Sequence, residues 1–126
     1  MSEAVPLVAH YPALPPSKQG LHKALREISL EKHVEYTAGS VVSKTLLKKD
    51  TGNITLFAFD TGQGLSEHTA PFDAVVHILD GEARITIGGQ PQTVPKADML
   101  IMPANISHAL HAEKRFKMPL VMIRGE

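Results

Sequence analysis

The feature of this sequence that most constrains its fold is a series of short apolar segments, starting at Val41, that are separated by turn-forming residues. Glycine, proline, asparagine and aspartate gather between these segments, and Asp80-Gly81 is a dipeptide typical of a tight hairpin turn. Many short strands with such turns indicate an all-β sandwich or barrel. The expected strands are Val41–Leu47, Ile54–Phe59, Val75–Leu79, Glu82–Ile87, Met99–Met102 and Leu120–Ile123.

The segment Ile54–Phe59 is unusual because both of its faces are mostly apolar. In a strand, alternate side chains point to opposite sides of the sheet. We therefore expect the outer face of this strand to be covered as well, either by the N-terminal helix or by a second subunit.

The first forty residues have a different pattern. Met1–Pro16 carries four prolines, which favours an extended arm. Ser17–Lys32 is predicted to be a short helix, with Ser17 as its N-cap and apolar residues at helical spacing up to Ile28. Val34 then alternates with polar neighbours, as in a strand. The expected organisation is an arm and short helix over residues 1–33, followed by a β-barrel domain over residues 34–126.

Composition limits the classes of function. A chain of 126 residues, 43% of them hydrophobic, predicts one domain with its own core. The formal net charge of +0 disfavours nucleic acid and anionic membranes as partners. Cysteine is absent, which excludes disulfides and thiolate chemistry. No apolar run reaches transmembrane length and the N-terminus does not resemble a signal peptide, so a cytoplasmic protein is predicted.

A motif-like stretch runs from Gly62 to Gly81, with His68 six residues after the first glycine. This spacing resembles the first motif of the cupin family, written G-x5-H-x-H-x3,4-E-x6-G. Two polar positions of the motif differ in this chain. Ala70 stands where the second histidine is usual, and Ala74 stands where the glutamate is usual.

The stretch that follows resembles the second cupin motif, G-x5-P-x-G-x2-H-x3-N. Pro103 and His108 fall on the motif positions. Ala97 and Asn105 replace the two glycines, and Ala112 replaces the final asparagine. The resemblance implies a double-stranded β-helix, which is a cupin or jelly-roll-like barrel, with a short N-terminal helix added in this chain.

The resemblance also bears on metal binding, because a typical cupin binds a divalent transition metal through three histidines and one glutamate. Here only His68 and His108 match ligand positions, and they would hold iron, nickel, manganese or zinc weakly. Asp73 is one position away from the place of the usual glutamate, and its side chain faces the lumen only if a bulge intervenes. Strand alternation predicts that His77 and His111 point outward.

The alanines also change the expected lumen, because they leave room where polar side chains usually stand. Two outcomes are open: a mostly apolar ligand pocket with two imidazoles, or a barrel filled by neighbouring side chains. The candidate ligand-binding residues are His68, His108, Phe72, Val76, Met102 and Leu110.

These observations support a small-molecule-binding cupin, acting as a sensor, carrier or accessory protein, as the first hypothesis. The alternative is a metal-dependent cupin enzyme of the dioxygenase or isomerase type, with a reduced metal site at His68 and His108. A structural or partner-binding module is a second alternative. No catalytic residue is assigned. A homodimer is expected, because single-domain cupins commonly pair through the outer face of one sheet.

Overall fold

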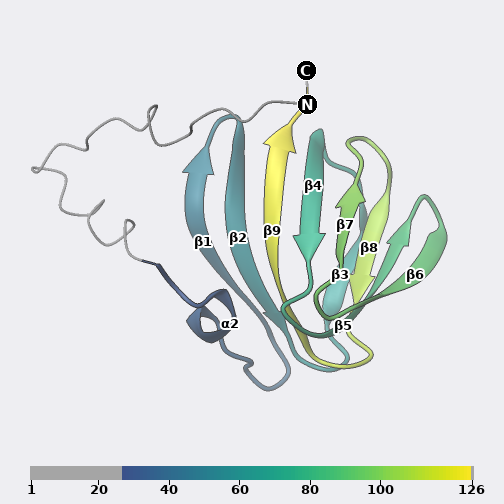
Figure 1. Cartoon of the computed structure of the whole chain (residues 1–126). Coiled ribbons are helices and arrows are strands. Elements are labelled where there is room, and N and C mark those ends of the chain that lie inside the picture. Colours follow the sequence, from purple (N-terminus) through teal and green to yellow (C-terminus); the bar gives the residue numbers. More distant parts are fainter. Residues whose placement is uncertain (1–26, 126) are drawn as a thin grey trace, which may run out of the picture.

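The computed structural model describes residues 27–125 of the chain. Within them, nine antiparallel strands form one curled sheet, and a single short helix, α2 (Leu30–His33), lies at its edge (Figure 1). The expected all-β barrel fold is confirmed. The strands are β1 (Val41–Lys49), β2 (Gly52–Phe59), β3 (Gly64–His68), β4 (Phe72–His77), β5 (Asp80–Ile87), β6 (Gln90–Pro95), β7 (Met99–Met102), β8 (His108–His111) and β9 (Phe116–Arg124).

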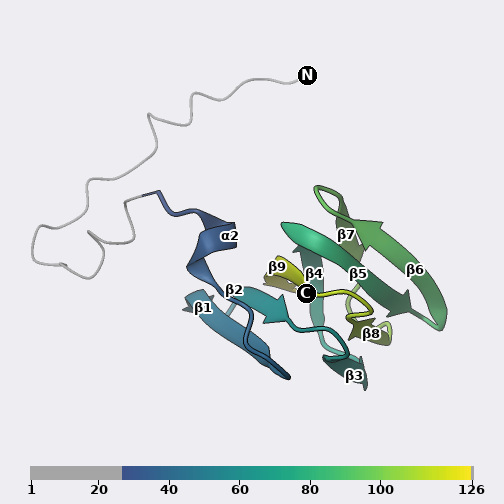
Figure 2. The ribbon, with the colours of Figure 1, turned by 90° about the horizontal axis from the view of Figure 1, so that it is seen from below.

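The sheet curls into two facing halves. One half has the order β1-β2-β9-β4-β7, and the other has the order β3-β8-β5-β6. Strand β5 joins them, because its first residues pair with β9 and its last residues pair with β8. Figure 2 views the curl from below, with β1 and β2 at one end of it and β5 and β6 at the other. The core lies inside the curl.

Strand alternation decides which side chains enter this core. In β4, Ala74 and Val76 are buried, whereas Asp73 and His77 are exposed. The largest buried side chains include Phe59 of β2 and Phe116 of β9, whose rings stack with centroids 4.5 Å apart. Burial of apolar side chains, to which such rings contribute much area, is the main favourable contribution to the folding of a small domain like this one.

The hairpin expected at Asp80-Gly81 is not formed. Strands β4 and β5 do not pair with each other; instead, Asp80 and Gly81 are the first residues of β5 and pair with Lys117 and Phe116 of β9. The dipeptide therefore carries the chain from one half of the curl to the other. Gly81 has a φ of +73°, and a Cβ there would overlap the carbonyl oxygen of Arg115, so only glycine fits without displacement.

The N-terminal helix is shorter than the sequence predicts. Residues 17–26 lie outside the described residues, and residues 27–29 are not helical. Ser29 has extended dihedrals and its side chain accepts a hydrogen bond from the backbone N–H of Lys32, so Ser29 is the N-cap of α2. The strand expected at Val34 is also absent. Val34 is instead 1% exposed and packs against Leu56.

That contact confirms the prediction that the outer face of β2 is covered. Leu56 and Ala58 form a small second core with Val34, outside the curl. The segment around α2, rather than a second subunit, covers this part of the face.

The two glycine positions of the second motif keep their backbone shape without glycine. Ala97 has a φ of 78° and Asn105 has a φ of 64°. Both values lie in the left-handed region that L-residues other than asparagine and aspartate rarely adopt. The N–H of Asn105 donates to the carbonyl of Ala70, at 2.8 Å, so this turn lies against the first motif.

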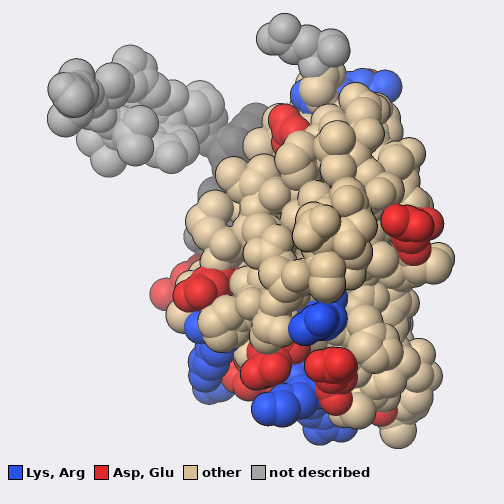
Figure 3. All heavy atoms as spheres, turned by 90° about the vertical axis from the view of Figure 1, so that its right-hand side faces the viewer, with Lys and Arg blue, Asp and Glu red and all other residues tan. Residues whose placement is uncertain are grey.

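Surface charge is mixed rather than concentrated on the face shown in Figure 3. Lysine and arginine lie next to aspartate and glutamate at one end of that face, and the remainder carries few charges. No helix within residues 27–125 has the length and apolar character needed to span a bilayer.

Candidate functional site

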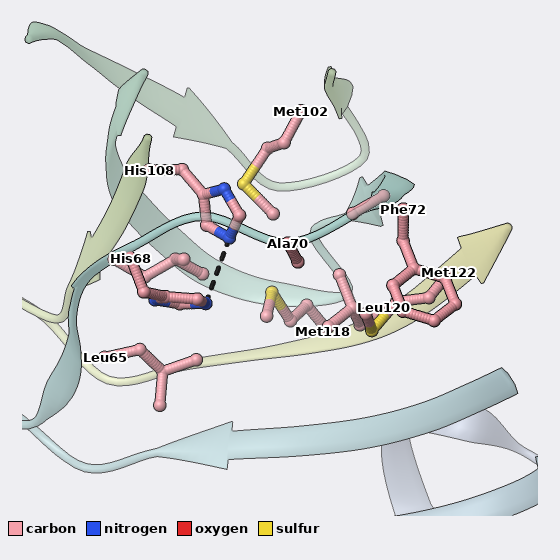
Figure 4. A pocket seen from close by; sticks show the side chains of 11 residues that line it. Leu65, His68, Ala70, Phe72, Met102, His108, Met118, Leu120 and Met122 are labelled. Atoms are coloured by element: carbon pink, nitrogen blue, oxygen red, sulfur yellow. Dashed lines mark hydrogen bonds between the residues drawn. The ribbon is translucent and has the colours of Figure 1, made fainter. Parts of the chain in front are cut away.

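A mostly enclosed pocket lies inside the curl, with about 50 Å³ of room for the centre of a water-sized sphere. Its wall is almost entirely apolar, and the two histidines of the motifs are its only nitrogen-bearing side chains among the described residues. The side chains come from β3, β4, β7, β8 and β9, apart from that of Ala70, which lies between β3 and β4 (Figure 4). The lining residues are Leu65, His68, Ala70, Phe72, Ala74, Met102, His108, Leu110, Met118, Leu120 and Met122.

The structure brings together five of the six side chains that the sequence nominates for this pocket: His68, His108, Phe72, Met102 and Leu110. Their ligand-binding role stays a prediction.

The sixth, Val76, does not line the pocket. It is fully buried in the core, because it lies two residues beyond Ala74 along β4, deeper in the packed part of the curl. His77 and His111 are exposed, as strand alternation predicts. Asp73 is exposed too, and its carboxylate accepts a hydrogen bond from the N–H of Ala104 instead of entering the lumen.

The two pocket histidines face each other directly. His68 and His108 are paired positions of β3 and β8, and their Nε2 atoms lie 3.1 Å apart. The rings meet edge to face, with an interplanar angle of 68°. His108 is 7% exposed, whereas His68 is exposed to solvent, so the pair extends from the pocket interior to its mouth.

A bulge in β3 makes this pairing possible. Leu65 pairs with Leu110 and His68 pairs with His108, so three steps along β3 match two steps along β8. In a regular strand, residues three apart face opposite sides. The extra residue lets both Leu65 and His68 face the pocket.

Hydrogen bonds to the backbone assign the tautomer of each ring. Nδ1 of His68 lies 2.7 Å from the carbonyl oxygen of Ser66, and Nδ1 of His108 lies 3.3 Å from that of Ile106. A carbonyl oxygen only accepts, so each Nδ1 carries the hydrogen and donates it. When both rings are neutral, both Nε2 atoms then carry lone pairs, and the 3.1 Å contact between them becomes a hydrogen bond only if one ring gains a second proton at Nε2.

Burial lowers the pKa of His108, and the charge of the nearby His68 acts in the same direction, while the hydrogen bond with Ile106 opposes them. A positive charge on the inner ring is therefore disfavoured. The neutral pair therefore presents two hydrogen-bond acceptors at the end of an apolar pocket. A hydrogen-bond donor or a cation would satisfy both.

The sequence interpretation missed the contribution of β9, which supplies Met118, Leu120 and Met122 to the pocket wall. The signal was present, because these residues alternate with Lys117, Pro119 and Val121 from Phe116 onward. The expected strand begins only at Leu120, and none of the three side chains is among the predicted pocket residues.

Comparison with known proteins identifies the family. The family described as the cupin domain matches residues 55–124, which is more than half of the chain. The chain belongs to the cupin family.

One of three similar proteins is itself described as a cupin. A conserved protein of unknown function from Streptococcus pyogenes has 36% identity and a TM-score of 0.77, with 81% of this cupin and 90% of that chain covered. A cupin superfamily protein from Desulfitobacterium hafniense has 33% identity and a TM-score of 0.76, with 80% and 93% covered. An uncharacterized protein of Streptomyces coelicolor is 28% identical over 71% of this cupin and 83% of that relative.

The residues present do not fit the four-ligand metal shell that is typical of cupins. Within residues 27–125, no group of three or more histidine, cysteine, aspartate or glutamate side chains could hold an ion. Ala70 and Ala74 occupy the positions of the missing imidazole and carboxylate, and Asp73 bonds to Ala104. Catalytic metal sites usually keep three protein ligands, so we derive no reaction through a divalent metal.

Proposed function

We propose that this cupin binds a small molecule in the pocket closed by His68 and His108. The observation that supports this most strongly is the combination of an enclosed apolar wall with two convergent imidazole acceptors. A concave, mostly apolar site with a few polar groups that fix orientation is typical of small-ligand binding. The exposed edge of His68 offers a route for the ligand to enter.

The size of the pocket limits the ligand. A volume of 50 Å³ for sphere centres holds on the order of three to five waters, since one water needs about 10–15 Å³ by this measure. The ligand therefore has only a few non-hydrogen atoms in the pocket. Because both Nε2 atoms accept, its polar end should be a donor, such as a hydroxyl or an ammonium group.

The experiment compares three probes with the same short tail: propanol, propylammonium and propionate. The full chain, kept in a chelator, is titrated with each probe while the imidazole resonances and the melting temperature are followed. We expect the two donors to shift the His68 and His108 resonances and to raise the melting temperature, and propionate to do neither. His108→Ala should remove both responses. The proposal is rejected if all three probes give equal responses, or if none of them gives a response.

Two alternative functions can be distinguished from ligand binding by experiment. A metal-dependent enzyme of the dioxygenase or isomerase type would require a bound ion, which elemental analysis of the purified protein detects. A structural or partner-binding module would respond to no small molecule. A cytoplasmic location stays a prediction of the sequence.

We also propose that two copies of this cupin pair through the outer face of the β1-β2-β9-β4-β7 half. An apolar row crosses this face, one residue per strand and in register: Leu47, Ile54, Val121, Val75 and Ile101. Leu47 is 48% and Ile101 is 53% exposed, at the two ends of the row. A twofold pairing of this face with itself would cover the whole row.

A further inference from the structure

Sulfur occupies the side of the pocket where the usual cupin carboxylate is missing. Ala74, which stands where cupins usually have glutamate, pairs with Met102 on one neighbouring strand and with Met122 on the other. Met118 lines the same pocket. Three of the five methionines of the chain thus surround one small cavity that also holds two imidazoles.

The imidazole pair is arranged to receive a cation. Both Nδ1 atoms face backbone carbonyls, so in the neutral rings both Nε2 atoms, which lie 3.1 Å apart, carry no hydrogen and each has a lone pair for an ion. Metal-binding histidines are oriented in the same manner, with one nitrogen on the metal and the other donating to a carbonyl. In a tetrahedral site with metal–nitrogen bonds of about 2.0–2.1 Å, the two nitrogens would lie about 3.3 Å apart. A small increase in the distance between the two Nε2 atoms would therefore be enough to admit an ion.

Two of the three thioethers are directed toward this gap. Figure 4 shows the sulfur atoms of Met102 and Met118 on the side of the pocket where the two imidazoles meet. Met102 is 2% exposed and Met118 is fully buried, so water does not compete for either sulfur. The sulfur of Met122 is engaged elsewhere, because it lies 3.9 Å from the side-chain nitrogen of Asn53, which donates to it.

We propose that the pocket is a binding site for monovalent copper, Cu(I), held by Nε2 of His68 and His108 and by the thioethers of Met102 and Met118. Soft thioether donors select Cu(I), whereas divalent iron, manganese and zinc prefer sites with carboxylates or further imidazoles. Charge favours the same choice. Among residues 27–125, no anionic side chain lines the pocket wall. Burying a monovalent ion costs roughly a quarter of burying a divalent one, since the Born cost grows with the square of the charge.

Flexible methionines also fill irregular gaps in cores, so the test must separate thioether chemistry from packing. Methionine-to-leucine changes do this, because they conserve volume and remove only the sulfur. The pair Met102→Leu/Met118→Leu removes the two donors that face the imidazoles. Met122→Leu is the matched control, since it lines the same pocket but its sulfur faces Asn53.

The full chain is titrated without oxygen against Cu(I) held by a coloured competing chelator, and the copper-loaded protein is examined by X-ray absorption. We expect one Cu(I) per chain, with nitrogen and sulfur scatterers. The Met102→Leu/Met118→Leu variant should bind at least about tenfold more weakly, Met122→Leu should bind like the wild type, and His108→Ala should lose the site. Circular dichroism verifies that each variant is folded.

The site is rejected if the folded wild type cannot withdraw Cu(I) from the chelator, or if the spectrum contains no sulfur and both methionine variants bind equally well. This inference shares the pocket of the proposed function but not its ligand. The propanol and propylammonium titrations are run in a chelator, so they report on the organic ligand alone. Failure of one experiment therefore leaves the other standing.

Discussion

The hydroxyl of Tyr36 donates a 2.6 Å hydrogen bond to the carboxylate of Asp80, which lies 44 residues further along the chain. The ring of Tyr36 lies beneath two cations, with the Arg115 guanidinium 4.4 Å and the Lys117 ammonium 5.0 Å from its centroid. Lys117 also donates to the carbonyl of Glu31 in α2. These contacts hold the segment before β1 against the end of the curl.

The first prediction concerns this contact. Tyr36→Phe should lower the free energy of unfolding by about 1–2 kcal/mol, because a half-buried hydrogen bond to a carboxylate is lost. Denaturant unfolding of Tyr36→Phe, Asp80→Asn and the double variant measures the coupling. Additive effects of the two changes would show that the hydrogen bond contributes nothing.

The second prediction concerns acid stability. The backbone N–H of Gly39, together with the guanidinium of Arg115, lowers the pKa of Asp60. The folded state therefore binds fewer protons there than the unfolded state. The resulting stabilisation is present above about pH 4, the pKa of an unfolded aspartate, and is lost as the pH falls through the lower folded pKa.

In Asp60→Asn, the free energy of unfolding should accordingly decrease less steeply than in the wild type as the pH falls below about 4. Urea unfolding of both proteins across this range provides the comparison. A parallel acid dependence in wild type and variant would mean that Asp60 is not responsible.

The third prediction uses the positive φ of Ala97. Ala97→Gly should raise the free energy of unfolding by about 0.5–1 kcal/mol, because relief of left-handed strain exceeds the greater chain entropy that glycine has when unfolded. Asn105→Gly should change stability less, since asparagine tolerates this region. If Asn105→Gly raises the denaturant midpoint more than Ala97→Gly does, backbone strain at Ala97 does not explain the stability gain.

The fourth prediction restores the typical cupin shell. Ala70→His/Ala74→Glu should create four ligands and bind zinc or nickel tightly, so that excess ion raises the stability by about 2.7 kcal/mol at one hundred times the dissociation constant. Without metal, the variant should melt below the wild type, because a carboxylate is placed in an apolar pocket. Calorimetric titration of the variant, with Ala70→His alone as control, measures the gain. Equal zinc affinity in wild type and double variant would show that the two alanines do not limit binding.

The fifth prediction tests the proposed dimer. Ile101→Lys places a charge at the end of the apolar row and should convert a dimer to a monomer at micromolar concentration. Ile106→Lys is the control, because Ile106 is 43% exposed but lies outside the row. Light scattering gives the mass of each. A monomeric wild type, or a dimer that persists in Ile101→Lys, would exclude pairing through this face.

The sequence by itself determined the family, six of the nine strands within residues 27–125 and the direction of many side chains. Alternation along β4 correctly separates buried Ala74 from exposed Asp73 and His77, because neighbours in one strand point to opposite sides whatever the strand pairs with. Motif spacing likewise located His68 and His108. These inferences needed only local geometry or a recurring pattern.

Only the tertiary structure decided how those parts meet. The bulge in β3 turns both Leu65 and His68 into the pocket, and it depends on the register with β8. The same holds for Asp80-Gly81, which pairs with β9 instead of forming a hairpin, and for Met122, which β9 brings beside Ala74. Register and pairing arise from contacts between residues far apart in the chain, and the period of a single strand carries no record of its partner.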